Sequence, residues 1–324
     1  MLLQSPTNLL DLVREKLQSK NYSIRTEQTY LSWVDQFLQF NNLIIPNEVR
    51  EQEVLFFLEY LAVDRQLAIS TQNQALCALR FLFREVLKKD VTGLSESIQL
   101  KRHHNLPIVL TKSEIGFLFE QMKGIHKLMA QLLYGSGLCL MECLQLRVQD
   151  LDFLSRQIIV RDHFGEEIRV TILPDCLVEP LQRHLRHVHL QHEDDLADGN
   201  GFGYPPKTLS KNYPGIEKEW IWQYVFPSDR VFSGSDSHGN RRNHVDASGL
   251  QKAIHKAAIQ AEFEKHVSAH TLRHTFAVHM LEAGYDILTV KELLGHKDLS
   301  TTMIYKRVLQ QDGFAVRSPL DIRN

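Results

Sequence analysis

Apolar residues recur every three or four positions through most of residues 7–90, which is the spacing of one helical face. In one of these stretches Tyr30, Trp33 and Phe37 share a face. Ser70-Thr71 offers a hydroxyl N-cap before the last stretch. Helices are expected at 8–18, 26–40, 54–61 and 71–87. The pattern predicts a small four-helix domain that spans about 7–92.

Residues 93–107 lack this periodicity and are predicted to link two domains. The stretch includes Lys101 and Arg102, followed by two histidines and then Pro107. Basic side chains here could lie along a passing strand of DNA. A short basic run is also common on any solvated surface, so this run alone leaves both interpretations open.

The second half of the chain mixes helical periodicity with two short strand patterns. Helices are expected at 112–122, 126–135, 142–146, 176–192, 247–263, 271–283, 287–294 and 301–308, and strands at 158–160 and 168–172. Gly295 is placed to end the penultimate helix in a left-handed conformation. The prediction is a mainly α fold with a small β-sheet (α+β): a second domain at 108–309, an insertion at about 197–246 and a tail at 310–324.

Composition describes an ordinary globular protein. With 324 residues the chain has room for about two domains, and 43% of its residues are apolar. Its formal net charge is −2, whereas a simple DNA-binding protein is usually basic. Any basic surface for DNA must therefore come from segregation of charge in three dimensions.

Neither a metal site nor a cofactor is expected. The four cysteines form no Cys-x-x-Cys pair, and Cys139 and Cys143 are predicted to be buried thiols in a reducing cytosol. The histidines at 184, 187, 189 and 192 are spread around a helix and lack further ligands. The acidic run 193–195 is expected in an exposed loop. The sequence contains neither a signal peptide nor an apolar run that could span a bilayer, which predicts a cytoplasmic protein associated with the nucleoid.

The chemistry is concentrated near the end of the second domain. In order along the chain, His270, Arg273, His296 and Tyr305 supply an imidazole, a cation for phosphate oxygens, a second imidazole and a phenol nucleophile. This set suits attack by tyrosine on a phosphodiester, with a covalent phosphotyrosyl intermediate. The other interpretation is a helical domain that happens to be rich in histidine.

The ordered series resembles the signature of the tyrosine recombinases, His-x-x-Arg followed by His or Trp and then Tyr. The resemblance implies an N-terminal helical, SAM-like domain that grips DNA and a catalytic domain that cleaves it. It also implies a homo-oligomer, a tetramer in the synapse, and a 3′-phosphotyrosine intermediate.

Two positions of that resemblance are degenerate. The segment 135–142 has the frame of the family's first arginine box, but Cys139 stands where the arginine is expected, while the assisting Glu142 is present. The segment 158–169 has the frame of a basic β-hairpin, but Phe164 stands where the lysine that protonates the leaving oxygen is expected.

Either loss is costly for catalysis. Removing one charge-stabilising donor typically lowers the rate by about 10²–10³-fold, and removing a general acid lowers it by about 10²–10⁴-fold. Three interpretations remain: a decayed recombinase, which we favour, a DNA-binding scaffold, or an enzyme rescued by His163, Arg161 or Arg169.

The insertion points to a subfamily. Trp220-Ile-Trp222-Gln-Tyr224 places aromatic residues at every second position, which predicts an extended segment with one aromatic face. Such a face either closes a small core or stacks on unpaired bases, where stacking is worth about 1–3 kcal/mol per base. With Arg241-Arg242, these words resemble the integron integrases, which recognise folded single-stranded sites through flipped bases.

The sequence thus predicts an integron-type, site-specific DNA recombinase with impaired activity on folded single-stranded or duplex sites. The alternative is a catalytically inactive DNA-binding relic. A metal-dependent hydrolase fits poorly because no ligand triad is correctly spaced. Candidate DNA contacts are Lys101, Arg102, Arg241, Arg242, Trp220 and Trp222.

Overall fold

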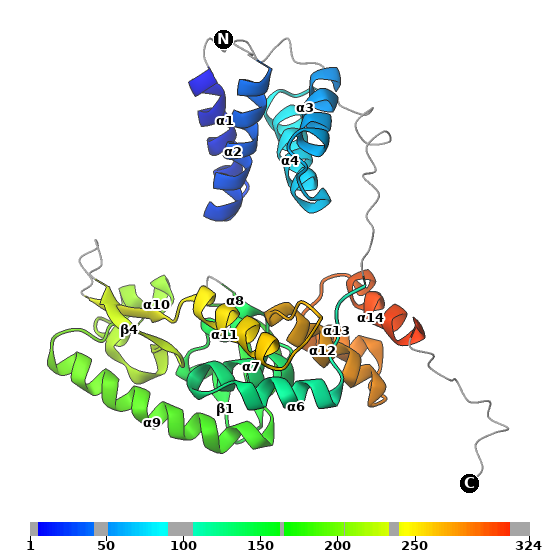
Figure 1. Cartoon of the computed structure of the whole chain (residues 1–324). Coiled ribbons are helices and arrows are strands. Elements are labelled where there is room, and N and C mark those ends of the chain that lie inside the picture. The colour runs from blue at the N-terminus through cyan, green and yellow to red at the C-terminus, as the bar shows by residue number, and fades with distance from the viewer. Residues whose placement is uncertain are drawn as a thin grey trace. The chain divides into compact units, whose positions relative to one another are not determined.

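The computed structural model divides the chain into two compact units, residues 1–104 and 105–324. It describes residues 6–41, 51–89, 106–162, 165–203, 205–232 and 240–311. Most of them are helical, and the strands belong to two small sheets in the second unit (Figure 1). The predicted α+β fold class is therefore confirmed.

The first unit is a bundle of helices around its own apolar core. Its elements are α1 (Pro6–Ser19), α2 (Ile24–Phe40), α3 (Glu51–Val63) and α4 (Ile69–Phe81), and α4 continues into a π-helical turn, η2 (Leu82–Val86). Phe37 and Phe57 pack edge to face with their centroids 5.5 Å apart in this core. The predicted N-cap of the last helix is wrong: α4 begins after Ala68, which forms no side-chain cap.

The core of the second unit surrounds α7 (Gly124–Ser136). Helices α6 (Lys112–Gln121), α11 (Ala247–Gln260) and α12 (Ala269–Glu282) pack against α7. The short helix α8 (Leu140–Leu144), a 3₁₀ turn η3 (Val148–Asp150) and the strand β1 (Leu151–Asp152) follow α7 along the chain. β1 pairs with β2 (Gln157–Arg161), and β2 pairs with β3 (Glu167–Ile172), so all three strands form one antiparallel sheet.

The last two helices complete the surroundings of the site. Helix α13 (Ile287–Leu294) packs against β3, and α14 (Leu299–Gln311) packs against α12. Gly295 follows α13 with a φ of 70°, which confirms the predicted left-handed ending. The turn that it forms lets the chain reverse between α13 and α14.

The insertion differs from its prediction. Helix α9 (Asp175–Ala197) runs through the acidic residues expected in an exposed loop, and Asp195 is buried. α10 (Lys207–Asn212) is followed by a 3₁₀ turn, η4 (Ile216–Lys218). The expected extended aromatic segment instead begins with a second 3₁₀ turn, η5 (Trp220–Trp222). The unpredicted strands β4 (Pro227–Phe232) and β5 (Arg241–His244) then pair antiparallel.

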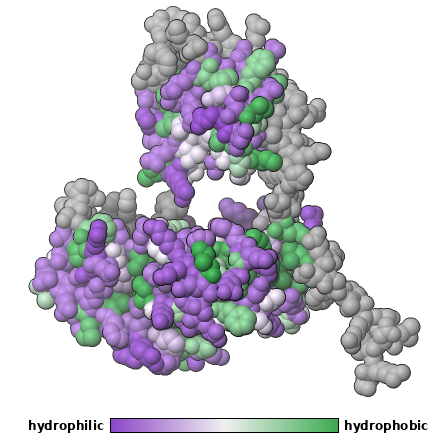
Figure 2. Space-filling view, viewed as in Figure 1, coloured by the Kyte–Doolittle hydropathy of each residue, from purple (hydrophilic) through white to green (hydrophobic). Residues whose placement is uncertain are grey.

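Polar side chains dominate the visible surface of both units, with apolar residues scattered among them (Figure 2). None of the described helices is long and apolar enough to cross a membrane.

Candidate active site

A glycine turn after α7 brings Cys139 to the site. Gly137 ends α7 with a φ of 64°, and a Cβ there would lie 2.5 Å from the ring of Phe276 on α12. The backbone oxygen of Ser136 accepts a hydrogen bond from Thr171 Oγ1 at 2.7 Å, which fixes the turn to β3. Only glycine tolerates both the conformation and the close ring.

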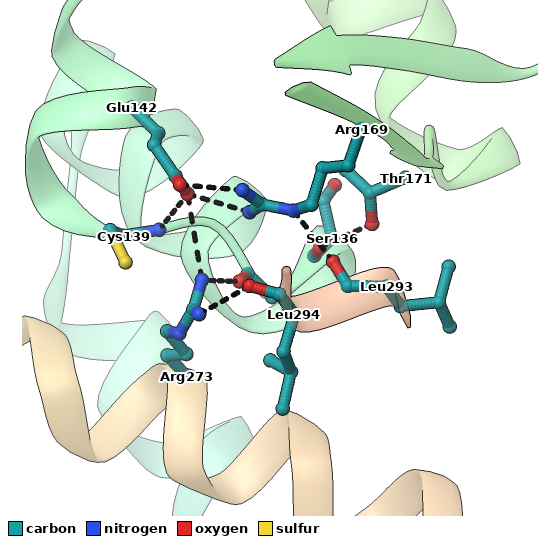
Figure 3. Close-up of polar contacts among 9 residues, drawn as sticks. Ser136, Cys139, Glu142, Arg169, Thr171, Arg273, Leu293 and Leu294 are labelled. Atoms are coloured by element: carbon teal, nitrogen blue, oxygen red, sulfur yellow. Dashed lines mark hydrogen bonds and ion pairs between the residues drawn. The ribbon is translucent and has the colours of Figure 1, made fainter. Parts of the chain in front are cut away.

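Cys139 is the N-cap residue of α8. Its backbone N–H donates to Glu142 Oε2 at 2.7 Å, in the reciprocal geometry of a capping box (Figure 3). Burial and the nearby Glu142 carboxylate raise the pKa of the Cys139 thiol, although Arg273 and Arg169 partly oppose this. The side chain is therefore a neutral thiol at physiological pH.

Glu142 is held by Arg169 of β3. Arg169 donates from Nη1 and Nη2 to the two carboxylate oxygens, at 2.6 and 2.7 Å, and from Nε to the Leu293 carbonyl at 2.9 Å. Burial would raise the pKa of Glu142, but the hydrogen bonds and charge of Arg169, together with the Cys139 N–H and Arg273, lower it. Glu142 is thus an ionised anchor for this guanidinium.

Arg273 of α12 lies on the other side of the same carboxylate. It is 7% exposed, and it donates from Nη1 to the Gly137 carbonyl and from Nη2 to the Leu294 carbonyl, both at 2.6 Å. Its Nη1 is also 3.5 Å from Glu142 Oε2 (Figure 3). Two guanidiniums and one carboxylate leave a net positive charge at this point, which suits an anion such as a phosphodiester.

Tyr305 of α14 lies beside these cations and is 2% exposed. Its Oη is 2.9 Å from Nδ1 of His274, the residue after Arg273. The His296 ring stacks near the phenol at 6.2 Å, and His296 Nδ1 is 2.9 Å from Thr302 Oγ1. Burial raises the pKa of Tyr305, an effect that the charge of Arg273 partly offsets.

The two inner histidines are neutral at physiological pH. Burial lowers the pKa of His274 to about 4, with His270, Arg273 and His296 adding to the effect. Burial and the charges of Arg273 and Arg169 lower the pKa of His296 to about 4 as well. Both imidazoles are therefore available as proton or hydrogen-bond acceptors at neutral pH.

Comparison with known proteins agrees with this geometry over most of the chain. Residues 109–312 match the model of the phage integrase family, and residues 9–93 match the phage integrase N-terminal SAM-like domain. The chain belongs to the phage integrase family. These are the tyrosine recombinases, and site-specific recombination of DNA is the reaction that the family assigns to the chain.

Two relatives, each named integrase/recombinase, come from Escherichia coli and Pseudomonas aeruginosa. Each is 41% identical to this chain over 313 residues, which covers 97% of this chain and 93% of the relative. Among solved structures, the XerH site-specific recombinase bound to a palindromic difH substrate has a TM-score of 0.63 at 19% identity. The match covers 96% of this chain and 97% of that one. At that identity, the likeness concerns the fold.

Among the residues predicted from the recombinase signature, the structure brings together Cys139, Glu142, Arg273, His296 and Tyr305. His270 is the second residue of α12 and has an exposed side chain, and its ring stacks on His274 at 6.2 Å. Phe164, Lys101 and Arg102 lie outside the described residues.

The sequence did not predict one residue of the site, His274, and it suggested a different role for another, Arg169. His274 was not predicted as a site residue. It directly follows Arg273 and lies one helical turn after His270, and this position could have signalled it. Arg169 was considered as a substitute for a lost cation, whereas the structure commits three of its N–H groups to Glu142 and Leu293.

Two of the candidate DNA contacts of the insertion, Arg242 and Trp222, have structural roles. Arg242 forms a two-pronged ion pair with the buried Asp195, because its Nε and Nη2 donate to the two carboxylate oxygens. Trp222 is 6% exposed, and the Arg147 guanidinium lies 5.9 Å from its ring centroid. Trp220 is half-buried against His189 and His192 of α9.

The α9 histidines are engaged with the protein. His184 Nε2 is 2.7 Å from the Val225 carbonyl, and His192 Nε2 is 3.0 Å from the Lys218 carbonyl. No group of three potential metal ligands occurs within the described ranges.

Proposed function

We propose that this recombinase is of the integron integrase type and that its strand cleavage is impaired. The observation that carries the proposal is the cation cluster. Arg169, Glu142 and Arg273 are assembled around the start of α8, where a neutral Cys139 stands in place of the expected arginine. The scaffold of a phosphate site is present with one of its charges missing.

The missing charge matters most in the transition state. Attack by tyrosine places additional negative charge on the non-bridging oxygens, which an arginine stabilises with two fixed donors. The two arginines considered as substitutes do not make up for this loss, and the third candidate, His163, lies outside the described residues. Arg169 is anchored to Glu142 and to a carbonyl, and Arg161 donates from Nε to the buried Asp150 at 2.8 Å. The resemblance adds a second loss at Phe164, the position of the general acid.

The substrate we propose is a recombination site of DNA, duplex or folded from a single strand, bound by a tetramer in the synapse. This rests on the resemblance of the insertion to integron integrases. Exposed apolar side chains of the insertion support it, because Tyr213 is 61% and Ile221 is 40% exposed. The protein should bind a hairpin folded from the bottom strand of a recombination site more tightly than a duplex of random sequence. Its affinity should fall steeply as the salt concentration rises. Equal affinities that do not respond to salt would contradict this substrate.

The roles of the two tryptophans can be separated. Trp222→Ala is expected to destabilise the fold by about 3–5 kcal/mol, because it empties a buried aromatic site. Trp220→Ala should weaken hairpin binding while random duplex binding stays nearly unchanged. If Trp220→Ala instead weakens binding of both DNAs equally, or changes neither, Trp220 does not read unpaired bases.

A covalent adduct on a nicked suicide substrate tests the proposed impairment. The wild type should form little adduct. Cys139→Arg combined with Phe164→Lys should restore it, and adding Tyr305→Phe should abolish it again. Each single repair should do much less, because the clamp and the acid act on the same transition state. Efficient recombination by the unmodified protein would overturn the proposal, and failure of the double repair would favour the DNA-binding relic.

A further inference from the structure

The phenol of Tyr305 is held by a histidine outside the four-residue signature. His274 Nδ1 lies 2.9 Å from Tyr305 Oη, although the two residues are 31 positions apart in the sequence. We propose that His274 is the general base that takes the proton of Tyr305 as the phenol attacks the scissile phosphate. This inference rests on the proposed function, because it assigns a step of that reaction.

The choice of His274 over the other imidazoles follows from their contacts. His296 directs its Nδ1 to Thr302 Oγ1, and its ring meets Tyr305 by stacking. His270 is exposed, and its ring stacks on His274. Of these three imidazoles, His274 is the one with a nitrogen at hydrogen-bond distance from the reacting oxygen, which is the first requirement for a general base.

The electrostatics of the pocket favour this role. The groups that face His274 are His270 and Arg273 of its own helix, His296 after α13 and Tyr305 of α14. Burial and the three basic neighbours keep the imidazole neutral, so it can accept a proton. Burial also keeps the Tyr305 phenol protonated, so the phenol needs a base before it can attack. A bound phosphodiester offsets the charge of Arg273 and thereby raises the proton affinity of His274.

The step balances without an oxidant or a metal. The proton passes from Tyr305 Oη to His274 Nδ1 as Oη forms its bond to phosphorus. The bond from phosphorus to the 5′ oxygen breaks, and the leaving oxygen takes a proton from water. In the reverse step a 5′ hydroxyl attacks phosphorus and gives its proton to the hydroxide that the water left. The bond from phosphorus to Oη breaks, and His274 returns its proton to Oη.

The first test is independent of DNA and of cleavage. In the free, full-length protein labelled with ¹⁵N-histidine, the His274 resonances are assigned by their loss in His274→Gln. At pH 7 we expect Nδ1 to be the unprotonated acceptor and Nε2 to carry the proton. A predominant Nδ1–H tautomer would overturn the proposal, because that nitrogen could not accept the phenol proton.

The second test measures adduct formation on a suicide substrate whose scissile 5′ oxygen is replaced by sulfur. A thiolate leaves without a proton, so this substrate does not need the acid expected at position 164. His274→Asn keeps a polar atom near the phenol but cannot act as a base. We expect it to slow adduct formation by about 10²–10⁴-fold, with unchanged binding of the duplex.

His279→Asn is the matched control. His279 lies on the same helix, and its Nδ1 also meets a tyrosine oxygen at 2.9 Å, that of Tyr134. We expect this variant to react at the wild-type rate. A wild-type rate in His274→Asn would show that the reaction does not need His274 as a base. A faster rate would show that its hydrogen bond holds the phenol back from attack. Both results would overturn the proposal.

Failure of the proposed function can be distinguished from failure of the proposed role of His274. If the wild type forms no adduct even with the sulfur substrate, the protein is a catalytically inactive DNA-binding relic and not an impaired recombinase. The role of His274 is then decided by its tautomer in the wild type and by the effect of His274→Asn in the Cys139→Arg, Phe164→Lys protein. If that repaired protein is also inactive, the proposal fails.

Discussion

Glu142→Gln should destabilise the catalytic unit strongly, because this carboxylate holds two guanidiniums. It accepts two hydrogen bonds from Arg169 and one from the Cys139 N–H, and Arg273 lies 3.5 Å away. The side chains of Glu142, Arg169 and Arg273 are 19%, 7% and 8% exposed. Removing one partner of such a buried pair costs about 3–5 kcal/mol, because the remaining charges are left uncompensated. At about 2–4 °C per kcal/mol for a unit of this size, the Tm should fall by roughly 6–20 °C.

Glu114→Gln is the matched control for this prediction. Glu114 occupies the same capping-box position in α6 and accepts the Thr111 N–H at 2.7 Å. Its cation, Lys265, is 42% exposed, so the loss should be about 0–1 kcal/mol. Calorimetry of the full chain measures both variants. Equal, small losses in the two would refute the view that charge at Glu142 holds the site together.

The stability difference between the wild type and Glu142→Gln should depend on pH. The folded-state pKa of Glu142 is below its ordinary value of 4.5, so its charge stabilises the fold above that pH and loses this effect as the pH falls through the folded-state pKa. The difference in stability between wild type and Glu142→Gln should be constant near neutral pH and shrink in acid. A difference that persists unchanged at low pH would point to packing and away from charge.

Two further substitutions test the structural roles assigned above. Arg242→Gln should cost about 3–5 kcal/mol in urea unfolding, since it leaves the buried Asp195 unpaired, whereas Arg183→Gln in an exposed pair should cost about 0–1 kcal/mol. Equal losses of unfolding free energy in the two variants would contradict the structural role of Arg242. Gly137→Ala should cost more than Gly124→Ala, because both have a positive φ but only a Cβ at 137 meets a ring, at 2.5 Å. Equal thermal shifts would show that the turn has room.

The helical elements could be predicted because their signals are local. The helix expected at 287–294 begins and ends where the structure has α13, and Gly295 adopts the expected left-handed conformation. The acidic end of α9 could not be predicted, because the residue that allows Asp195 to be buried is Arg242, which lies 47 positions later. The alternating aromatic residues suggested an extended segment at 220–224. In the structure Trp222 instead lies in a 3₁₀ turn, and its side chain is buried.

The site was predictable as a list of residues and not as a set of contacts. The order from His270 to Tyr305 comes from the sequence. The structure brings five of the predicted residues together in one site: Cys139, Glu142, Arg273, His296 and Tyr305. That Arg169 pairs with Glu142, and that His274 meets the phenol, depends on where β3, α12 and α14 pack. Residue spacing carries no such information.

The most direct test of the central claim compares 5′-oxygen and 5′-sulfur suicide substrates with the wild-type protein. If the clamp is weakened and the leaving-group acid is missing, the sulfur substrate should form adduct about 10²-fold or more faster than the oxygen substrate. Phe164→Lys should narrow the gap by accelerating only the oxygen substrate. Rapid and equal adduct formation on both substrates by the unmodified protein would show that its active site is intact, and would contradict the account.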